Sequence, residues 1–195
     1  MGMKRLFIGL QIDAEPRQRL GAALISMRKL AQSQNLAVAW TKPENLHLTV
    51  KFLGETDASR VAEVTSRLEV LAAQTKPFAL EFSSWGAFPD EDQAKVLWVA
   101  AHEPLGLLKF FAVGVEAAML ELGFPAEARE FVPHLTVARF KPGVSIKELL
   151  NPTRVSVREM GFGFSRVREV VLYESARGPG GSVYTPLASR PFQGA

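Results

Sequence analysis

The chain has 195 residues, which is enough for one domain or for two small lobes. Hydrophobic residues make up 47% and charged residues 22%, a composition typical of a folded globular protein and not of a disordered one. The absence of cysteine excludes disulfides, thiol nucleophiles and cysteine-bound zinc. The net charge is +3, with the excess of Lys and Arg in residues 127–195, and it mildly favours an anionic partner. We find no signal peptide and no membrane-spanning run, so we expect a cytoplasmic protein without a membrane partner.

Strand-like and helix-like segments alternate along the chain. Three segments carry apolar residues at helical spacing: one after the N-cap candidate Asp13, one after Asp57, and one that Gly123 is placed to end. The expected strands are residues 4–12, 37–40, 77–82, 95–101, 154–159, 164–173 and 183–187, together with two strands described below. Turns are expected at residues 85–89 and 178–181, and a short helix or turn at residues 145–150. Many connections are hairpin-short, and residues 77–82 and 95–101 are expected to pair antiparallel, which favours an antiparallel α+β fold.

The tetrapeptide His-Leu-Thr-Val occurs twice, at residues 47–50 and 134–137. Each copy lies in a β-prone run, and we expect each run to be a strand. Gly54 is expected to close the first strand, and the turn formers Lys141–Gly143 to bound the second. The repetition suggests an old internal duplication, with two similar lobes that each contribute one of these strands to a cleft between them.

The two copies place the same side chains together. Because residues two apart share a face of a strand, His47 should project with Thr49, and His134 with Thr136. An imidazole takes or gives a proton near neutral pH, and a hydroxyl donates to a phosphate oxygen. One such pair on a strand is uninformative, but two pairs in the same context predict a shared functional site.

Two imidazoles on either side of a phosphate suit general acid–base catalysis. A neutral one takes the proton of the attacking oxygen, and a protonated one gives a proton to the leaving oxygen. Thr49 and Thr136 would then stabilise the charge on the phosphoryl oxygens. Metal binding is the alternative use of histidine, but zinc needs three or four ligands, and the remaining histidine, His102, lies at an expected turn. Residues 178–181 lack the Lys-Ser/Thr of a phosphate-binding loop and do not predict a nucleotide site. From both observations we expect neither metal nor cofactor.

Further segments, spread in order over almost the whole chain, match one known family. They are Arg5–Phe7, Trp40, Pro43–Gly54, Gly86–Pro89, Val96–Val99, Gly123–Phe124, Phe131–Arg139 and Tyr184. With the paired motifs, these segments resemble the two-histidine (2H) phosphoesterase superfamily, and most closely its RNA 2′,3′-cyclic phosphodiesterases, also described as 2′-5′ RNA ligases.

The resemblance implies one bilobal domain over residues 1–195, built from antiparallel sheet with flanking helices around a central cleft. It implies metal- and ATP-independent opening of RNA 2′,3′-cyclic phosphate ends to 2′-phosphates, and we expect a monomer. His47 would be the proton donor to the departing 3′ oxygen, and His134 the proton acceptor that activates water. Ligation would be the reverse reaction, with an RNA 5′-hydroxyl in place of water. RNA is required because the 2′ oxygen belongs to the reacting ring.

The resemblance also makes Arg139 the candidate phosphate-binding residue. Its offset of five from His134 would place it on the opposite face of an ideal strand. A bulge, a strand end or strong twist must therefore bring it to the histidine face. In the first copy, Lys51 has an offset of four and is expected on the histidine face.

Three aromatic residues, Phe7, Phe52 and Tyr184, are candidates to stack on a base, with core packing as the alternative for both phenylalanines. Two other functions stay open, because the motifs contact only a phosphate. One is a 2H enzyme that acts on a small cyclic nucleotide phosphate or a 2′-5′ oligonucleotide. The other is a non-catalytic module that binds RNA ends, although binding alone is better served by Lys or Arg than by two histidines.

Overall fold

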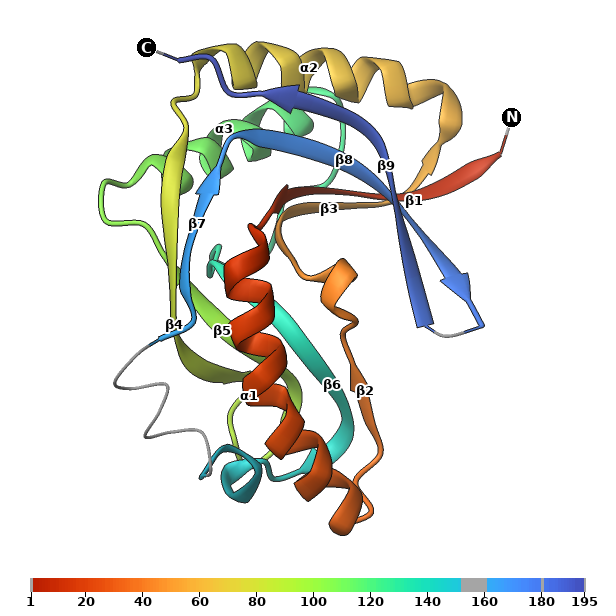
Figure 1. Ribbon diagram of the computed structural model, residues 1–195. Coiled ribbons are helices and arrows are strands. Elements are labelled where there is room, and N and C mark those ends of the chain that lie inside the picture. Colours follow the sequence, from red (N-terminus) through yellow and green to blue (C-terminus); the bar gives the residue numbers. More distant parts are fainter. Residues whose placement is uncertain (1, 152–160, 180, 195) are drawn as a thin grey trace.

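The computed structural model describes residues 2–151, 161–179 and 181–194 (Figure 1). Within them, nine strands form one curled antiparallel sheet that three long helices flank, so the fold is α+β as expected; a short helical turn covers residues 147–151. The strands are β1 (Met3–Gln11), β2 (Val38–Trp40), β3 (His47–Asp57), β4 (Phe78–Phe88), β5 (Ala94–His102), β6 (His134–Val144), β7 (Gly163–Val167), β8 (Glu169–Gly178) and β9 (Gly181–Pro191). The helices are α1 (Ala14–Ser33), α2 (Val61–Gln74) and α3 (Leu107–Glu121).

The sheet consists of two half-sheets that meet at the two motif strands. The strand order is β7-β4-β5-β6-β3-β1-β8-β9, with β2 paired to β6. Strands β3 and β6 pair at Leu48 and Leu135, and no other pair joins them in the described residues. We call β3-β1-β8-β9 the first half-sheet, and β6-β5-β4-β7 with β2 the second half-sheet. The two motifs therefore lie at the junction between the half-sheets.

In both halves of the chain a strand and a helix precede the motif strand. The chain runs from β1 through α1 and the short β2 to β3, and α1 packs on β7 of the second half-sheet. Helix α3 connects β5 with β6 but packs on β3 of the first half-sheet and on α2 (Figure 1). This reciprocal arrangement agrees with the expected internal duplication.

One contiguous hydrophobic core lies under both half-sheets. Leu6, Ile8 and Leu10 are fully buried on one face of β1, as the alternation of a half-buried strand requires. Burial of each such side chain contributes about 1.5–3 kcal/mol. The opposite face of β1 carries Phe7, which belongs to a separate small cluster with Val171 and Tyr173. None of the helices in residues 2–151, 161–179 and 181–194 has the length and hydropathy that a membrane-spanning helix needs.

The elements expected within the described residues are present, and the differences lie at their boundaries. The three helices, the first strand and the antiparallel pairing of β4 with β5 are confirmed. Asp57 caps a 3-10 turn, Ala58–Arg60, directly before α2, by accepting a hydrogen bond from the Ser59 backbone N at 2.8 Å. Asp13 precedes α1, but its carboxylate accepts from the Arg166 backbone N at 2.7 Å and so ties the helix start to β7.

Four expected boundaries are corrected. Gly54 does not close β3. It has a positive φ of 72° and pairs with Leu6 beside an irregularity in the pairing with β1, and the strand continues to Asp57. The turn expected at residues 85–89 falls largely inside β4, which continues past an irregularity to Phe88. Strand β6 likewise continues through residues 141–143. The strand expected at residues 164–173 divides at Arg168 into β7 and β8, which belong to different half-sheets. The strand expected at residues 154–159 lies outside the described residues.

Lys51 is not on the histidine face, which corrects that expectation. In the pairing of β1 with β3, Gly9 faces Thr49 and Ile8 faces Lys51, so Val50 is an extra residue that reverses the alternation. The side chain of Lys51 is 3% exposed on the core side, where its ammonium contacts the Glu116 carboxylate at 2.7 Å and the Pro125 carbonyl at 3.0 Å.

The Lys51–Glu116 pair generates a stability prediction. Glu116→Gln leaves a buried ammonium without a counter-charge, and we expect a loss of about 1.5–3 kcal/mol in the free energy of unfolding, measured in urea. Lys51→Met removes the charge and keeps the apolar stem, so its loss should be smaller. Lys109→Gln, on the exposed side of α3, is the matched control. A Glu116→Gln protein as stable as this control would contradict the prediction.

Candidate active site

The pairing of the motif strands brings their four polar side chains to one face of the sheet. Leu48 and Leu135 are antiparallel partners. One step to either side of this pair, His47 lies opposite Thr136, and Thr49 lies opposite His134. The two imidazoles are therefore diagonal neighbours, at positions that are typically about 7–8 Å apart. A phosphate group fits between side chains at this spacing.

A second bulge brings Arg139 to the same face. Along β6, Thr136 faces Trp98 and Ala138 faces Leu97, so Val137 is the extra residue, at the position of Val50 in the first copy. The alternation reverses there, and Arg139 projects on the side of His134, as its proposed role requires. Its positive charge is close enough to lower the pKa of His134.

The residue at the place of Arg139 in the first copy is Phe52. It follows Val50 at the same offset, its side chain is 54% exposed, and its ring centroid is 6.0 Å from that of Phe7. The two copies thus present a cation on one side of the site and an accessible aromatic ring on the other.

Backbone carbonyls orient both imidazoles in the same way. His47 Nδ1 donates to the Asn45 carbonyl at 2.7 Å, and His134 Nδ1 donates to the Val132 carbonyl at 2.6 Å. A carbonyl only accepts, so the proton of each neutral ring is on Nδ1 and each Nε2 is the nitrogen that can accept. Nε2 of His47 accepts from the Thr49 hydroxyl at 3.0 Å. Both Nε2 atoms are thereby prepared for proton transfer.

Aromatic rings surround each histidine. The His47 ring has neighbours in Phe7, Tyr184 and Tyr173, with centroid distances of 4.7, 5.1 and 5.9 Å. Phe7 is only 2% exposed and packs against the imidazole, which agrees with the core-packing alternative for this residue. Tyr184 stands edge-on to His47 and lines an open hollow, where its ring is accessible.

The His134 ring is enclosed in the same manner by Phe88 at 5.3 Å and Trp98 at 5.9 Å. Trp98 in turn lies over Gly86, where a Cβ atom would come within 2.2 Å of the indole. A residue without a side chain is needed at that position of β4.

The environment lowers the pKa of both histidines. The pKa of His47 is lowered from 6.5 to about 4, mainly by burial; the hydrogen bond to Asn45 opposes the shift, and the charges of His134 and Arg17 contribute to it. Burial likewise lowers the pKa of His134, with a contribution from Arg139. Both imidazoles are therefore mainly neutral at pH 7 in the free protein.

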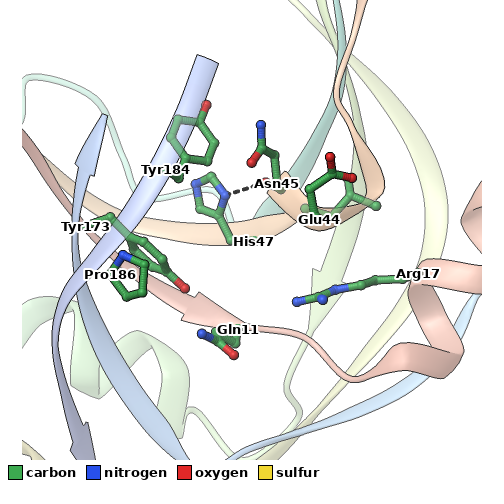
Figure 2. A pocket seen from close by; sticks show the side chains of 9 residues that line it. Gln11, Arg17, Glu44, Asn45, His47, Tyr173, Tyr184 and Pro186 are labelled. Carbon is green, nitrogen blue, oxygen red and sulfur yellow. Dashed lines mark hydrogen bonds between the residues drawn. The ribbon is translucent and has the colours of Figure 1, made fainter. Parts of the chain in front are cut away.

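A hollow of about 170 Å³ opens beside His47 (Figure 2). It is lined by Gln11, Arg17, Glu44, Asn45, Leu46, His47, Tyr173, Tyr184 and Pro186. The sequence motifs include His47 and Tyr184 but miss Gln11, Arg17 and Tyr173. These three residues come from β1, α1 and β8, and no local sequence pattern predicts that the fold brings them together.

Histidine ligation of a metal was the alternative use of the motifs. Among residues 2–151, 161–179 and 181–194, no group of three or more His, Cys, Asp or Glu side chains is placed to hold a metal ion. His102 is exposed at the end of β5.

The lowered pKa of His47 predicts how stability depends on pH. The folded protein holds this proton less well than the unfolded chain, so stability is lost as the pH falls from about 6.5 through about 4. The full shift corresponds to about 3 kcal/mol. Urea unfolding at pH 7, 5.5 and 4 should show a smaller loss for His47→Gln than for the wild type, while the surface variant His102→Gln keeps the wild-type dependence. Equal pH dependence in all three proteins would contradict this assignment.

Comparisons with known proteins place the chain among relatives that match most of its length. The chain matches the family described as LigT like Phosphoesterase over residues 12–98 and 104–184, which include both motifs. RNA 2′,3′-cyclic phosphodiesterases of Archaeoglobus fulgidus and Aquifex aeolicus are similar to it. The first is 32% identical over 183 residues, or 94% of this chain and 97% of that protein. The second is 30% identical over 147 residues, or 75% of this chain and 77% of that protein.

Solved structures share the fold. A crystal structure of a Thermus thermophilus protein has a TM-score of 0.73 and 25% identity, covering 97% of this chain and 98% of that one. Escherichia coli LigT in its apo form has a TM-score of 0.69 and 24% identity, covering 98% of each chain. The similarity thus extends over both half-sheets.

Proposed function

The chain belongs to the LigT-like phosphoesterase family and is a cyclic phosphodiesterase, and we propose that it opens the 2′,3′-cyclic phosphate ends of RNA to 2′-phosphates. The observation that carries the proposal is the arrangement of His47, Thr136, His134 and Thr49 around the single pair that joins β3 to β6. It offers two proton-transfer groups and two hydroxyls to one phosphate. The relatives named above supply the substrate class.

The two histidines divide the proton transfers. His134 Nε2 takes a proton from water as the water oxygen bonds to phosphorus. His47 Nε2 gives a proton to the 3′ oxygen as its bond to phosphorus breaks. The 2′ oxygen stays bonded to phosphorus, and the hydroxyls of Thr49 and Thr136 donate to the non-bridging oxygens. Each transfer contributes on the order of 10²- to 10⁴-fold to the rate.

The substrate supplies the charge that this chemistry needs. In the free site both imidazoles have lowered pKa values, so His47 must gain its proton when the substrate binds. A phosphodiester carries one negative charge, which favours an imidazolium beside it. The guanidinium of Arg139 would bind the same phosphate through its planar fork.

Several finer properties belong to the same proposal. Each half-sheet supplies one histidine, so residues 1–195 would act as one bilobal catalytic unit, and a monomer suffices. Neither a metal nor ATP takes part in the steps. Ligation would be the same reaction in reverse, with an RNA 5′-hydroxyl in the place of water and a 2′-5′ linkage as the product.

The test is hydrolysis of a short RNA with a 2′,3′-cyclic phosphate end, in EDTA and without ATP. We expect a 2′-phosphate product. His47→Ala and His134→Ala should each lose on the order of 10²- to 10⁴-fold in kcat, while His102→Ala keeps wild-type activity. A 3′-phosphate product would reverse the orientation of the ring between the half-sheets. Full activity of either active-site variant, or dependence on a metal, would overturn the proposal.

The lowered pKa values predict the pH profile. The reaction needs one protonated and one neutral imidazole, and in the free enzyme both pKa values lie below 6.5. The profile of kcat/KM should therefore reach its maximum on the acidic side of pH 6.5 and fall as the pH rises. The bound phosphate raises the imidazole pKa, so the profile of kcat should lie at higher pH. An optimum of kcat/KM above pH 7 would contradict the prediction.

Substitution of Arg139 tests phosphate binding. Arg139→Ala should lower kcat/KM by roughly 10- to 100-fold, since a charge-assisted hydrogen bond contributes about 1.5–3 kcal/mol. Arg139→Lys should restore only part of this, because an ammonium lacks the planar fork. Lys29→Ala, which removes an exposed charge from α1, is the control. The prediction is wrong if Arg139→Ala behaves like Lys29→Ala.

A further inference from the structure

The hollow beside His47 contains a cation that the proposed chemistry does not use. Arg17, in the first turn of α1, is half-buried, and its Nε is fully buried without a hydrogen-bond partner. Within the described residues it has no ion pair, whereas Arg19 pairs with Glu15 at 2.7 Å and Arg28 stacks on Trp40. An unpaired guanidinium at a concave surface is suited to an anionic ligand.

The guanidinium points into the hollow. Figure 2 shows it reaching from α1 toward Gln11, below His47 in that view. It lines the hollow together with His47 and Tyr173, and its charge lowers the pKa of both. The Gln11 side chain is hydrogen-bonded to Tyr173.

Neither the other polar side chains of the hollow nor its volume opposes the binding of an anion beside Arg17. Asn45 donates from Nδ2 to the Ser182 carbonyl at 2.7 Å and is held in place. Glu44 is the only acidic residue of the lining, and it is exposed at the rim, where solvent screens its charge. A volume of about 170 Å³ holds several water molecules, which a phosphate group would displace.

The hollow lies on the ribose side of the reaction. In the proposed mechanism His47 protonates the 3′ oxygen, which stays on the ribose, so the ribose lies on the His47 side of the phosphate. His47 lines the hollow, whereas His134 and Thr136 do not. A strand that continues from this ribose in the 5′ direction therefore leads toward Arg17.

Resting on the proposed function, we propose that Arg17 binds the phosphodiester on the 5′ side of the terminal ribose. Arg17 is then a specificity-determining residue, with the Gln11 amide as a second donor. The enzyme selects the end of an RNA strand over a free nucleoside 2′,3′-cyclic phosphate, because only the strand brings a phosphate into the hollow. This distinguishes RNA from small cyclic nucleotides, which share the reacting ring.

The experiment compares three substrates: a nucleoside 2′,3′-cyclic phosphate with a 5′-hydroxyl, the same nucleotide with a 5′-phosphate, and a dinucleotide with the same cyclic end. For the wild type, kcat/KM should be roughly 10- to 100-fold higher for the second and third than for the first. In Arg17→Gln both ratios should fall to near one. Ratios cancel any general effect of the substitution on the pKa of His47.

Two controls sharpen the comparison. Arg19→Gln removes an equal charge from the start of α1 but not from the hollow, and it should keep the wild-type ratios. Arg17→Lys should keep part of them. For the dinucleotide, the slope of log kcat/KM against log salt should be less steep by about 0.7 in Arg17→Gln, as for one lost phosphate contact.

The possible outcomes separate this proposal from the proposed function. Wild-type ratios near one, or ratios that Arg17→Gln leaves unchanged, overturn the role of Arg17 even if all three substrates are hydrolysed. A gain for the 5′-phosphate without a gain for the dinucleotide also overturns it, because the hollow would then take a terminal phosphate and not a strand. If none is hydrolysed, the proposed function fails, and the binding of the three intact nucleotides to the wild type and Arg17→Gln still decides the role of Arg17.

Discussion

The site depends on a single backbone pairing, Leu48 with Leu135, which joins two half-sheets that have no other ladder between them in the described residues. Both leucines are completely buried, so the core fixes which face of each strand turns inward. A slip of one residue would exchange the faces and move both imidazoles into the core. The hydrophobic face thus specifies the catalytic face, and the apolar members of the motif matter to the site as much as the polar ones.

The paired bulges show how one strand pattern serves two purposes. In both copies the valine of the motif is the extra residue, and the alternation reverses after it. The residue at offset five then projects beside the histidine, as Arg139 in one copy and Phe52 in the other. The residue at offset four turns to the core, where Ala138 is fully buried and Lys51 requires Glu116 as a partner. The two copies share the backbone path of the strand and its bulge, and they differ in the side chains at offset four, which are buried, and at offset five, which are exposed.

The sequence predicted what is local or repeated. A spacing of two places His47 with Thr49 on any strand, and the repetition of the motif distinguished the pattern from chance. The odd offset of Arg139 also showed that a bulge, a strand end or strong twist must bring it to the histidine face, and the structure has the bulge. Features that depend on non-local pairing were beyond reach: β3 continues past Gly54 because β1 pairs with it, and the chain divides at Arg168 because its two sides join different half-sheets. Arg17 and Tyr173 approach His47 for the same reason, from segments without a motif.

The electrostatics of the free site favour a protonation that is coupled to the substrate. Burial lowers the pKa of both histidines, and the charges of Arg17, Arg139 and His134 add to the shift, so the free site disfavours a charged imidazole. An anion between the rings reverses this balance, because it screens the two cations and attracts the proton. The proton donor is then formed mainly when a phosphate is present. Burial among aromatic rings strengthens the same coupling, because desolvation disfavours an imidazolium that lacks an anion beside it.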